Sequence, residues 1–475
     1  MLDKNIYISR RKALLEKMKG ESGIILFMGN SDAPAQYVSN CYQWRQDSSW
    51  IYFWGIDEPC YAATIDLETG AETIYADDLE IDDLIWTGPV PTVSEQAARA
   101  GVTDTRKYGQ LSWTVTDAMI KGRKIHFLPV SRYCNAIKLS SLLGLEPMEF
   151  FSKGKKGCPK ASAALVEAVI ALRLVKSPEE IELMDKVADL GIEMHVAARK
   201  GIRTGRMEQE IVSEMESVAR NGGWGISFST ILTQHGEIFH CASHQNPIVP
   251  GKLLVVDAGA EDWEHYASDF TRTYPTSGKF THRQKDIYTT VYECNELAYS
   301  LAAPGVAYRD VHQAVCRHML ENLSQIGLVH GDVDNMMELG VAGLFMPHGL
   351  GHNIGLDVHD MEDYGEDLVG YDKDQSRSTL LGLGSLRMAR KLTPGNVISD
   401  EPGIYFIPDL IKSWKAEGKC AEYINYSMLE QYFDFGGIRL EDDLLITADG
   451  VRRLGNSRLP IAPVDVESAM EKDKN

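Results

Sequence analysis

Acidic residues lie within or at the ends of four stretches that otherwise have the composition of buried β-strands. Asp257 ends the apolar run in LLVVDAGA, and Asp269 lies in the strand-like stretch SDFTRT twelve residues later. Glu401 stands in NVISDEPGIYF and Glu441 in GGIRLEDDLLIT. A carboxylate on a buried strand is costly unless it is paired or bound to a metal ion. We therefore expect neighbouring strands that bring these four acids to one interior location.

Three of the chain's 13 histidines lie in one short segment, MPHGLGHNIGLDVHD, at residues 346–360. His348 and His352 have the spacing of two zinc ligands on a helix, but the glycines around them disfavour a helix. LDVHD alternates like a strand, which would place His359 on a defined face behind a glycine-rich loop. From this segment alone, functional and purely structural roles for the histidines both stay open.

The combination of four carboxylates with an imidazole indicates the kind of metal ion that could bind. Such a hard, oxygen-rich set favours Mn²⁺ or a similar ion over a thiolate-bound zinc. With so many negative ligands, two ions about 3.5 to 4 Å apart fit better than one. Each acid taken singly is more often a surface residue, so the prediction depends on the joint pattern.

The overall charge excludes some classes of partner. The chain of 475 residues carries 48 basic and 68 acidic residues, a net charge of −20, which would repel nucleic acid and anionic membranes. No stretch approaches the roughly 18 to 20 apolar residues needed to span a bilayer, and the N-terminus lacks the apolar core of a secretory signal. The eight cysteines form no CxxC pair. We expect a cytoplasmic protein, because such scattered cysteines suit a reducing compartment.

The pattern along the chain predicts two domains. Short apolar runs alternate with polar helical stretches in the first third, including a hairpin expected to turn at Thr69 and Gly70, so residues 1–172 are predicted to form an α/β domain. A strong helix start follows, with Ser177 as N-cap, Pro178 after it and Glu180 completing a capping box. We place the second domain at residues 173–475.

Several of these segments resemble the pita-bread metallopeptidases, in the branch that contains aminopeptidase P and prolidase. The similar segments are HGLGHNIGLDVHD, DAGA followed by SDFTRT, DEPGIYF and GIRLEDD, in the family's order, together with WRQDSSWIYFWGIDEP, IWTGP and VKSPEEIELM. The resemblance extends over nearly the whole chain. It implies a creatinase/aminopeptidase P-like α/β N-terminal domain followed by an α+β pita-bread catalytic domain.

The resemblance also implies a ligand set for two divalent metal ions, Mn²⁺ in the first place and Co²⁺ or Zn²⁺ as alternatives. The five implied ligands are Asp257, Asp269, His352, Glu401 and Glu441. By the family pattern, Asp269 and Glu441 would bridge the ions, Asp257 would hold one ion, and His352 with Glu401 would hold the other. Arg439, two residues before Glu441 and so on the same strand face, would orient the ligands.

The mechanism implied by the resemblance is metal-assisted hydrolysis of a peptide bond. A hydroxide bridging the two ions would attack the carbonyl, Glu401 would manage the proton, and His359 would donate toward the developing oxyanion. His240 is similar to a second histidine that contacts the substrate, and His348 to a wall of the same pocket. His244 matches no family role, and we expect it to be structural or solvent-facing.

Members of this branch cleave the bond before proline but differ in how much chain follows it. The segment LGLGSLRMARKLTPGN resembles the prolidase segment in which an arginine, here Arg387, grips the free carboxylate of an Xaa-Pro dipeptide. The long insertion between Glu401 and Glu441 is also similar to prolidase. Both features favour a dipeptidase.

Other features favour an aminopeptidase. Trp86 in IWTGP resembles a tryptophan that helps to line the substrate site of aminopeptidase P. Two departures from the aminopeptidase pattern point the other way. Ser39 and Asn40 stand where bacterial aminopeptidase P commonly has an acidic residue ahead of its RQ motif, and the insertion at 364–380 departs from the shorter aminopeptidase form. Both activities stay open, within the wider class of Xaa-Pro exopeptidases.

The expected substrates are therefore Xaa-Pro dipeptides or peptides with proline in second position, and the expected assembly is a homodimer or homotetramer. Two alternatives come from other functional classes. One is a pita-bread protein that has lost its metals and acts as a binding protein, and the other is a creatinase-like hydrolase. The complete set of five ligand types argues against both.

Overall fold

The computed structural model describes residues 2–473, and the chain divides into two compact units. The N-terminal unit contains Met1–Arg173 together with Met361–Val369, and the C-terminal unit contains Leu174–Asp360 and Gly370–Asn475. Among the described residues, no helix combines the length and the apolar character needed to cross a membrane.

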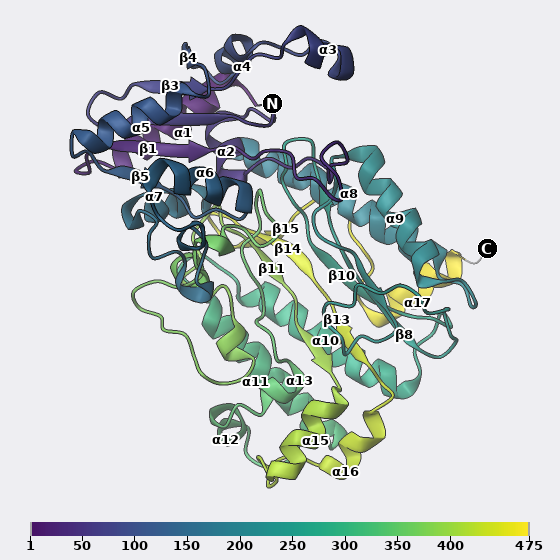
Figure 1. The fold of residues 1–475 in the computed structure, drawn as a ribbon. Helices are drawn as coiled ribbons and strands as arrows, with labels where there is room; N and C mark the ends of the chain where they lie inside the picture. Colours follow the sequence, from purple (N-terminus) through teal and green to yellow (C-terminus); the bar gives the residue numbers. More distant parts are fainter. Residues whose placement is uncertain (1, 474–475) are drawn as a thin grey trace. The chain divides into compact units, whose positions relative to one another are not determined.

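A five-stranded mixed sheet with the order β4-β3-β2-β1-β5 forms the centre of the N-terminal unit (Figure 1). Its strands are β1 (Ile24–Met28), β2 (Ala62–Asp66), β3 (Glu72–Tyr75), β4 (Asp104–Arg106) and β5 (Ile125–Phe127). Its helices are α1 (Lys4–Lys17), α2 (Ser48–Trp54), α3 (Ile81–Thr87), α4 (Val93–Arg99), α5 (Gln110–Ile120), α6 (Tyr133–Leu143) and α7 (Ala163–Arg173). The predicted hairpin is β2–β3, and Gly70 takes the positive φ of 71° that its turn requires.

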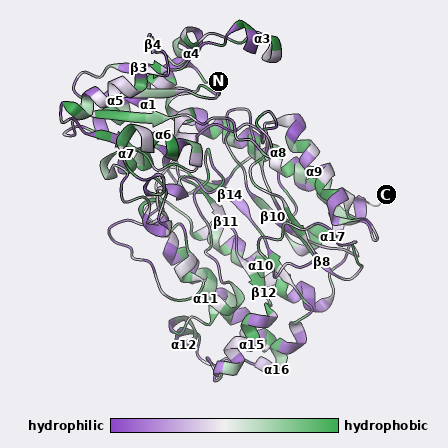
Figure 2. Cartoon of the chain, in the orientation of Figure 1, coloured by the Kyte–Doolittle hydropathy of each residue, from purple (hydrophilic) through white to green (hydrophobic). Residues whose placement is uncertain are grey.

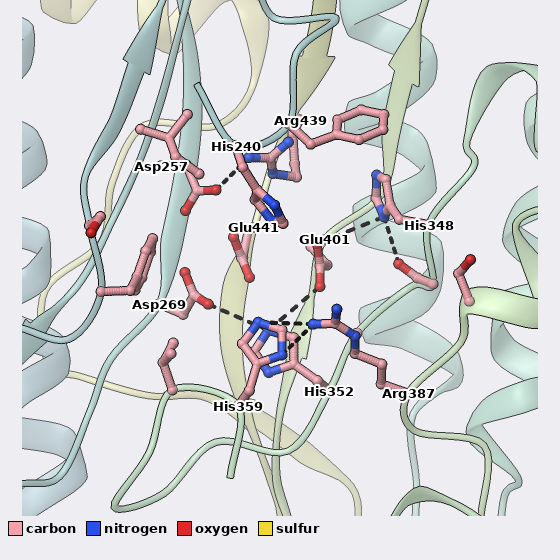
Figure 3. Close-up of a pocket in the computed structure, with 18 of the residues that line it drawn as sticks. His240, Asp257, Asp269, His348, His352, His359, Arg387, Glu401, Arg439 and Glu441 are labelled. Atoms are coloured by element: carbon pink, nitrogen blue, oxygen red, sulfur yellow. Dashed lines mark hydrogen bonds and ion pairs between the residues drawn. The ribbon is translucent and has the colours of Figure 1, made fainter. Parts of the chain in front are cut away.

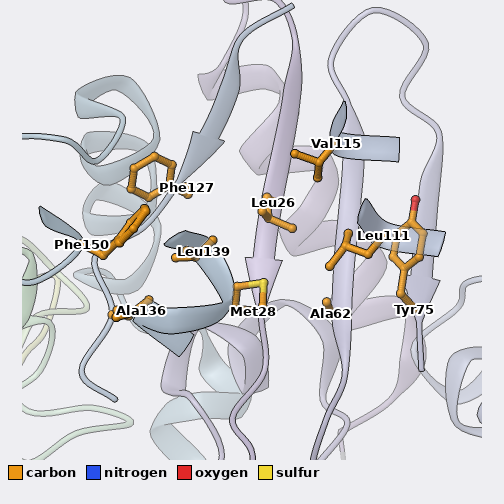
Figure 4. Packing of buried hydrophobic residues seen from close by; sticks show 11 residues of the cluster. Leu26, Met28, Ala62, Tyr75, Leu111, Val115, Phe127, Ala136, Leu139 and Phe150 are labelled. Carbon is orange, nitrogen blue, oxygen red and sulfur yellow. The ribbon is translucent and has the colours of Figure 1, made fainter. Parts of the chain in front are cut away.

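Strand β1 is apolar along its whole length because both of its faces are covered (Figure 2). Leu26 and Met28 point to the cluster that α5 and α6 bury, which also contains Phe127 and Phe150 (Figure 4). Phe27, on the opposite face, packs against the aromatic rings of α2. Successive side chains of β1 point to opposite faces, and both faces are buried. The strand sequence is therefore apolar at every position and does not alternate between apolar and polar residues.

Long helices and short antiparallel sheets make up the C-terminal unit. Its helices are α8 (Pro178–Gly201), α9 (Glu208–Gly222), α10 (His282–Leu301), α11 (Tyr308–Ile326), α12 (Val333–Glu338), α13 (Ala342–Phe345), α15 (Pro408–Glu417), α16 (Tyr426–Leu429) and α17 (Pro463–Lys472). Helix α14 (Glu366–Gly370) falls, except for its last residue, in the segment Met361–Val369 of the N-terminal unit. Its strands are β6 (Gly225–Ile226), β7 (Ile231–Thr233), β8 (Leu253–Ala258), β9 (Ala260–Glu261), β10 (Phe270–Pro275), β11 (Val397–Asp400), β12 (Gly403–Tyr405), β13 (Gly437–Arg439), β14 (Asp442–Ile446) and β15 (Val451–Arg453).

The strands pair as β10-β8-β7, β11-β14-β15, β12-β13 and β6-β9, all antiparallel. Helix α8 packs on β8, β9 and β10, and α10 packs on β11, β12, β13 and β15. Helix α8 begins at the predicted capping box. The Ser177 hydroxyl accepts from the Glu180 N–H at 3.4 Å, and the Glu180 carboxylate accepts from the Ser177 N–H at 2.9 Å.

The prediction that LDVHD forms a strand is wrong. Residues 356–360 form bends, and in this neighbourhood only Asn353 makes an isolated bridge, to Ile398 of β11. The Asp360 N–H donates to the Asn353 carbonyl at 2.9 Å and closes a loop, so the segment cannot extend. Gly355 permits this closure, because a Cβ there would lie 2.4 Å from the Asp360 carboxylate.

Candidate metal centre

Strand pairing brings the four predicted acids together (Figure 3). Asp257 near the end of β8 pairs with Thr271 of β10, and Asp269 immediately precedes β10. The Glu441 N–H, between β13 and β14, donates to the Thr271 carbonyl at 2.9 Å. Glu401 follows β11, the antiparallel partner of β14. The register of these strands therefore places carboxylates that are distant in sequence around one point.

His352 joins the acids through a fixed ring orientation. Its backbone N–H donates to the Ser399 hydroxyl at 3.0 Å, and its ring Nδ1 is 3.1 Å from the Asn353 carbonyl. Because Nδ1 donates to that carbonyl, Nε2 keeps its lone pair. Nε2 lies 3.4 Å from Asp269 Oδ2 and 3.6 Å from Glu401 Oε1. An oriented imidazole lone pair beside carboxylates is the arrangement of a metal ligand.

The electrostatics of the cluster favour a bound cation. Burial, reinforced by neighbouring carboxylates, raises the pKa of both Asp269 and Glu441 well above the usual range, and burial also raises the pKa of Glu401. Ligand atoms of Asp269, His352 and Glu441 all lie within 4.8 Å of one another. Among the described residues, the buried Asp269 Oδ1 has no hydrogen-bond partner. The donor set and this orphaned oxygen fit a divalent metal ion.

Arg439 connects the acids on one side of the cluster. Its guanidinium contacts Asp257 Oδ2, and its Nε donates to the Thr271 hydroxyl at 3.1 Å. That hydroxyl donates to Glu441 Oε2 at 2.6 Å. Arg439 Nη1 donates to the Tyr405 hydroxyl at 2.9 Å. One arginine thus fixes two carboxylates, one directly and the other through a threonine.

The acids face a cavity of about 500 Å³. Besides the five predicted ligands, its lining includes His240, His348, His359, Arg387, Arg439, Phe228, Ile231, Phe239 and Val358. Polar groups converge at one side, and apolar side chains form much of the remaining wall. A cavity of this size with a few convergent polar groups is typical of a small-molecule site.

His359 contacts both His352 and Arg387 at the cavity (Figure 3). The ring of His359 stacks on that of His352, with ring centroids 3.7 Å apart and an angle of 13°. Arg387 Nη1 contacts His359 Nδ1 and lies 3.2 Å from Nε2. Arg387, predicted to bind the substrate carboxylate, therefore contacts His359, predicted to donate a hydrogen bond to the oxyanion.

His348 lies at the end of a hydrogen-bond chain. Its Nδ1 donates to the Gly349 carbonyl at 2.7 Å, so its Nε2 accepts from the Tyr405 hydroxyl at 2.9 Å. Tyr405 in turn accepts from Arg439. Burial and the nearby Arg439 charge lower the pKa of His348 to about 3, and the ring is therefore neutral.

The other predicted residues lie in different surroundings. His240 is an exposed turn residue that lines the cavity. His244 is half-buried with its Nε2 3.1 Å from the Thr230 carbonyl, a structural contact. Trp86 belongs to the N-terminal unit, where it is 87% exposed on α3 and is not among the residues lining this cavity.

Sequence reasoning missed Asp443, a fully buried acid behind the ligands. Its Oδ2 accepts from the Asp269 N–H at 3.0 Å, which fixes the start of β10. The available signal was the run LEDDLL, since Asp443 shares a strand face with Glu441. Tyr405 was also missed, because nothing in DEPGIYF indicates that its hydroxyl connects Arg439 to His348.

Comparison with known families decides the identity of the fold. Residues 182–448, more than half of the chain, match the model of Metallopeptidase family M24, and residues 7–126 match the aminopeptidase P N-terminal domain. The chain belongs to metallopeptidase family M24. The predicted family and the predicted two-domain architecture are confirmed.

Relatives of this M24 metallopeptidase cover both of its units. A human Xaa-Pro dipeptidase is 28% identical over 98% of this chain and 93% of its own length. The Xaa-Pro aminopeptidase of Escherichia coli K12 is 29% identical over 97% of this chain and 96% of its own length. The metallopeptidase thus falls in the predicted branch, and its assignment as a hydrolase of that branch is confirmed.

Solved structures agree with this placement. Pseudomonas aeruginosa aminopeptidase PepP superposes with a TM-score of 0.80 and 26% identity over 100% of this chain and 99% of its own. Escherichia coli aminopeptidase P with the inhibitor Pro-Leu gives a TM-score of 0.79 and 27% identity over the same shares. A zinc-substituted form of the E. coli enzyme in complex with product is also similar, with a TM-score of 0.80 and 26% identity over the same shares. The family and the carboxylate-imidazole cluster establish this M24 member as a user of divalent metal.

Proposed function

We propose that this M24 metallopeptidase hydrolyses the bond between an N-terminal residue and a following proline, in Xaa-Pro dipeptides or in longer peptides with proline in second position. The observation that carries the proposal is the convergence of Asp257, Asp269, His352, Glu401 and Glu441 on one cavity of about 500 Å³. The relatives named Xaa-Pro dipeptidase and Xaa-Pro aminopeptidase support this specificity.

The five converging residues would hold two divalent ions. Four carboxylates against one imidazole favour Mn²⁺, and Co²⁺ or Zn²⁺ fit the same donors. When bound, the ions supply a water-derived nucleophile at neutral pH and polarise the peptide carbonyl. Arg439 supports this assignment by holding Asp257 directly and Glu441 through Thr271, so that both carboxylates keep their positions.

Side chains of the protein would transfer the proton, stabilise the oxyanion and contact the substrate. Glu401 is accessible from the cavity, and burial raises the pKa of its carboxyl, so it can take a proton from water and deliver it to the leaving proline nitrogen. His359 would donate a hydrogen bond to the carbonyl oxygen as it gains charge. His240 would contact the substrate from the exposed turn, and the neutral His348 would form part of the wall of the same pocket.

Arg387 is proposed to bind the free carboxylate of a dipeptide. It lines the cavity beside His359, and a guanidinium binds a carboxylate through two parallel hydrogen bonds. A tripeptide has no carboxylate at that position. The preference for dipeptides over longer peptides therefore depends on how much of the binding energy comes from this one contact. Trp86 is proposed to contact the longer peptides.

Hydrolysis of Ala-Pro and Ala-Pro-Ala by the Mn²⁺-loaded enzyme tests the proposal, with Arg387→Ala beside the wild type. Loss of the charged contact should lower kcat/KM for the dipeptide by about 10- to 100-fold and leave the tripeptide rate nearly unchanged. Lys391→Ala is the matched control, since Lys391 is an exposed cation that pairs with Asp374. An equal loss for both substrates would mean that Arg387 acts through His359 instead.

Cleavage of Ala-Pro-Ala by the wild type as well as or better than Ala-Pro would assign the enzyme to the aminopeptidases. Absence of cleavage of both peptides by enzyme containing metal would refute the Xaa-Pro assignment. Near-zero Mn, Co and Zn after loading would instead favour a metal-free binding protein or a creatinase-like hydrolase.

We also propose a homodimer or homotetramer in the cytoplasm, with the N-terminal domain at 1–172 and the catalytic domain at 173–475. Helix α3 exposes Ile81, Ile85 and Trp86 by 74%, 72% and 87%, which is typical of a contact surface. All eight cysteines are free, as suits a reducing compartment. Light scattering of the purified protein measures the assembly directly.

A further inference from the structure

A second cavity, of about 240 Å³, lies within the C-terminal unit. Helices α11, α12 and α13, which lie near one another in Figure 1, supply part of its wall, and residues 378–383 supply the rest. The apolar side chains of the wall include Met337, Met346, Leu380 and Leu381. Part of the insertion at 364–380, which the catalytic site does not use, therefore forms a wall of this cavity.

A buried histidine lies at the wall of this second cavity. His312 of α11 lines it, is 2% exposed, and its Nδ1 has no hydrogen-bond partner among the described residues. Nε2 lies 3.5 Å from the Cys316 sulfur one turn along the helix. Burial raises the pKa of the Cys316 thiol to about 12 and lowers the pKa of His312 to about 4. The thiol therefore donates to Nε2, and the neutral ring carries its proton on Nδ1.

An arginine of the same helix also lines the cavity. Arg309 lines the cavity one turn before His312, and its only side-chain hydrogen bond among the described residues runs from Nη1 to the Ser376 carbonyl at 3.1 Å. A guanidinium has five N–H donors, so most of them remain for a ligand. A guanidinium with unused donors at the wall of an apolar cavity fits a carboxylate with an apolar body.

The remaining features narrow the ligand class. Glu338, at the end of α12, also lines the cavity and offers a negative charge for an ammonium group. At roughly 30 Å³ per water, the volume of about 240 Å³ equals about eight water molecules, which matches a single small amino acid. Carboxylate, ammonium and apolar body together describe an apolar α-amino acid.

Two chain segments each contribute neighbouring residues to this cavity and to the catalytic cavity. Met346 lines the second cavity, and the next residues, Pro347 and His348, line the catalytic one. Leu383 lines the second cavity, and Ser385 and Arg387 follow it into the catalytic one. A ligand that orders these segments can therefore change the positions of His348 and Arg387.

We propose that the second cavity binds one apolar α-amino acid, of the class that the proposed peptidase reaction releases, and that its occupancy alters the catalytic rate. The chemical class follows from the cavity alone, whereas its description as a reaction product rests on the proposed function. The catalytic rate would then depend on the local concentration of product.

Equilibrium dialysis of the full-length, Mn²⁺-loaded enzyme against radiolabelled L-proline and L-leucine tests the site. The wild type should bind one more equivalent of amino acid per chain than Arg309→Ala or the cavity-filling Leu381→Trp. Loss of the guanidinium should weaken this site by about tenfold or more. Arg317→Ala is the matched control, because Arg317 lies on the same helix but pairs with Asp334 outside the cavity.

The difference between variants separates this proposal from the proposed function, because any binding in the catalytic cavity is common to all four proteins. Equal binding by wild type, Arg309→Ala and Leu381→Trp would overturn the site and indicate a cavity filled by water only. If the site is present, the amino acid should change kcat for Ala-Pro in the wild type and in Arg317→Ala, but not in Arg309→Ala. An unchanged kcat in the wild type would overturn the regulatory role.

Discussion

At the scale of single residues, the positions of the carboxylates depend on groups that do not themselves face a metal ion. Arg439 holds Asp257, and Thr271 carries the effect of Arg439 to Glu441. Asp443 accepts from the backbone of Asp269. Because the ligand carboxylates repel one another, their geometry without a cation is maintained by these contacts.

Replacing Arg439 by alanine should therefore weaken the metal centre. Asp257 would lose its buried counter-charge and Thr271 its donor, so metal affinity or kcat/KM should fall by about 10- to 100-fold. Metal content by mass spectrometry and Ala-Pro hydrolysis measure the two effects. Arg452→Ala, which removes a partly exposed arginine paired with Asp185, is the control. Unchanged turnover together with unchanged metal content would contradict the role of Arg439.

At the scale of elements, the site depends on how closely the histidine segment approaches β11. The Ser399 N–H donates to the His352 carbonyl at 2.9 Å, and the Glu401 N–H donates to the Leu350 carbonyl at 2.9 Å. Gly351 lies between these two contacts, and a Cβ there would come within 2.0 Å of the Ser399 carbonyl. The glycine is required by this close approach and not by an unusual φ.

Gly351→Ala should separate the segment from β11 and displace His352. We expect kcat/KM to fall by about tenfold or more, with a loss of stability of about 1 to 3 kcal/mol from overpacking. Gly109→Ala is the control, because a Cβ at that position meets nothing within 4 Å. Activity equal to that of the wild type would show that the strand can shift without moving the imidazole.

Helix α8 contains a histidine whose burial makes stability depend on pH. Burial, reinforced by the Arg272 charge, lowers the pKa of His195 from 6.5 to about 4, so the folded chain keeps it neutral. Between pH 6.5 and 4 the unfolded chain binds a proton that the folded chain does not. The contribution of neutral His195 to the free energy of unfolding is therefore fully present above pH 6.5 and decreases as the pH is lowered. At pH 5 the decrease is on the order of 2 kcal/mol.

Urea unfolding of the wild type and His195→Phe at pH 7 and pH 5 measures this contribution. The variant should lose less stability on acidification than the wild type, whatever its stability at pH 7. His282→Phe, at a side chain that is 95% exposed, is the control and should behave like the wild type. Parallel pH dependence in wild type and His195→Phe would show that His195 does not contribute.

At the scale of the whole molecule, strand composition and acid placement were readable from the sequence, whereas contacts between distant segments were not. Asp257, Asp269, Glu401 and Glu441 stood out because each lies within or at the end of a stretch with the composition of a strand. The strand expected at LDVHD failed because Asp360 closes a loop onto Asn353, a contact that alternation of residues cannot reveal. The second cavity was likewise hidden, since His312 and Leu381 are brought together only by the fold.

The division into two units predicts where metal binding stabilises the chain. The predicted ligands all belong to the C-terminal unit, while the cluster around Leu26 and Phe127 belongs to the N-terminal unit. At a free metal concentration a hundredfold above Kd, binding should stabilise the folded site by about 2.7 kcal/mol. Chelation should therefore accelerate amide hydrogen exchange in β8, β10, β11 and β14, because repulsion among the acids is no longer offset. Exchange in β1 and β2 should not change. Equal acceleration in both units would show that the metal stabilises the chain globally, and no acceleration in either would contradict the assignment of the cluster as a metal site.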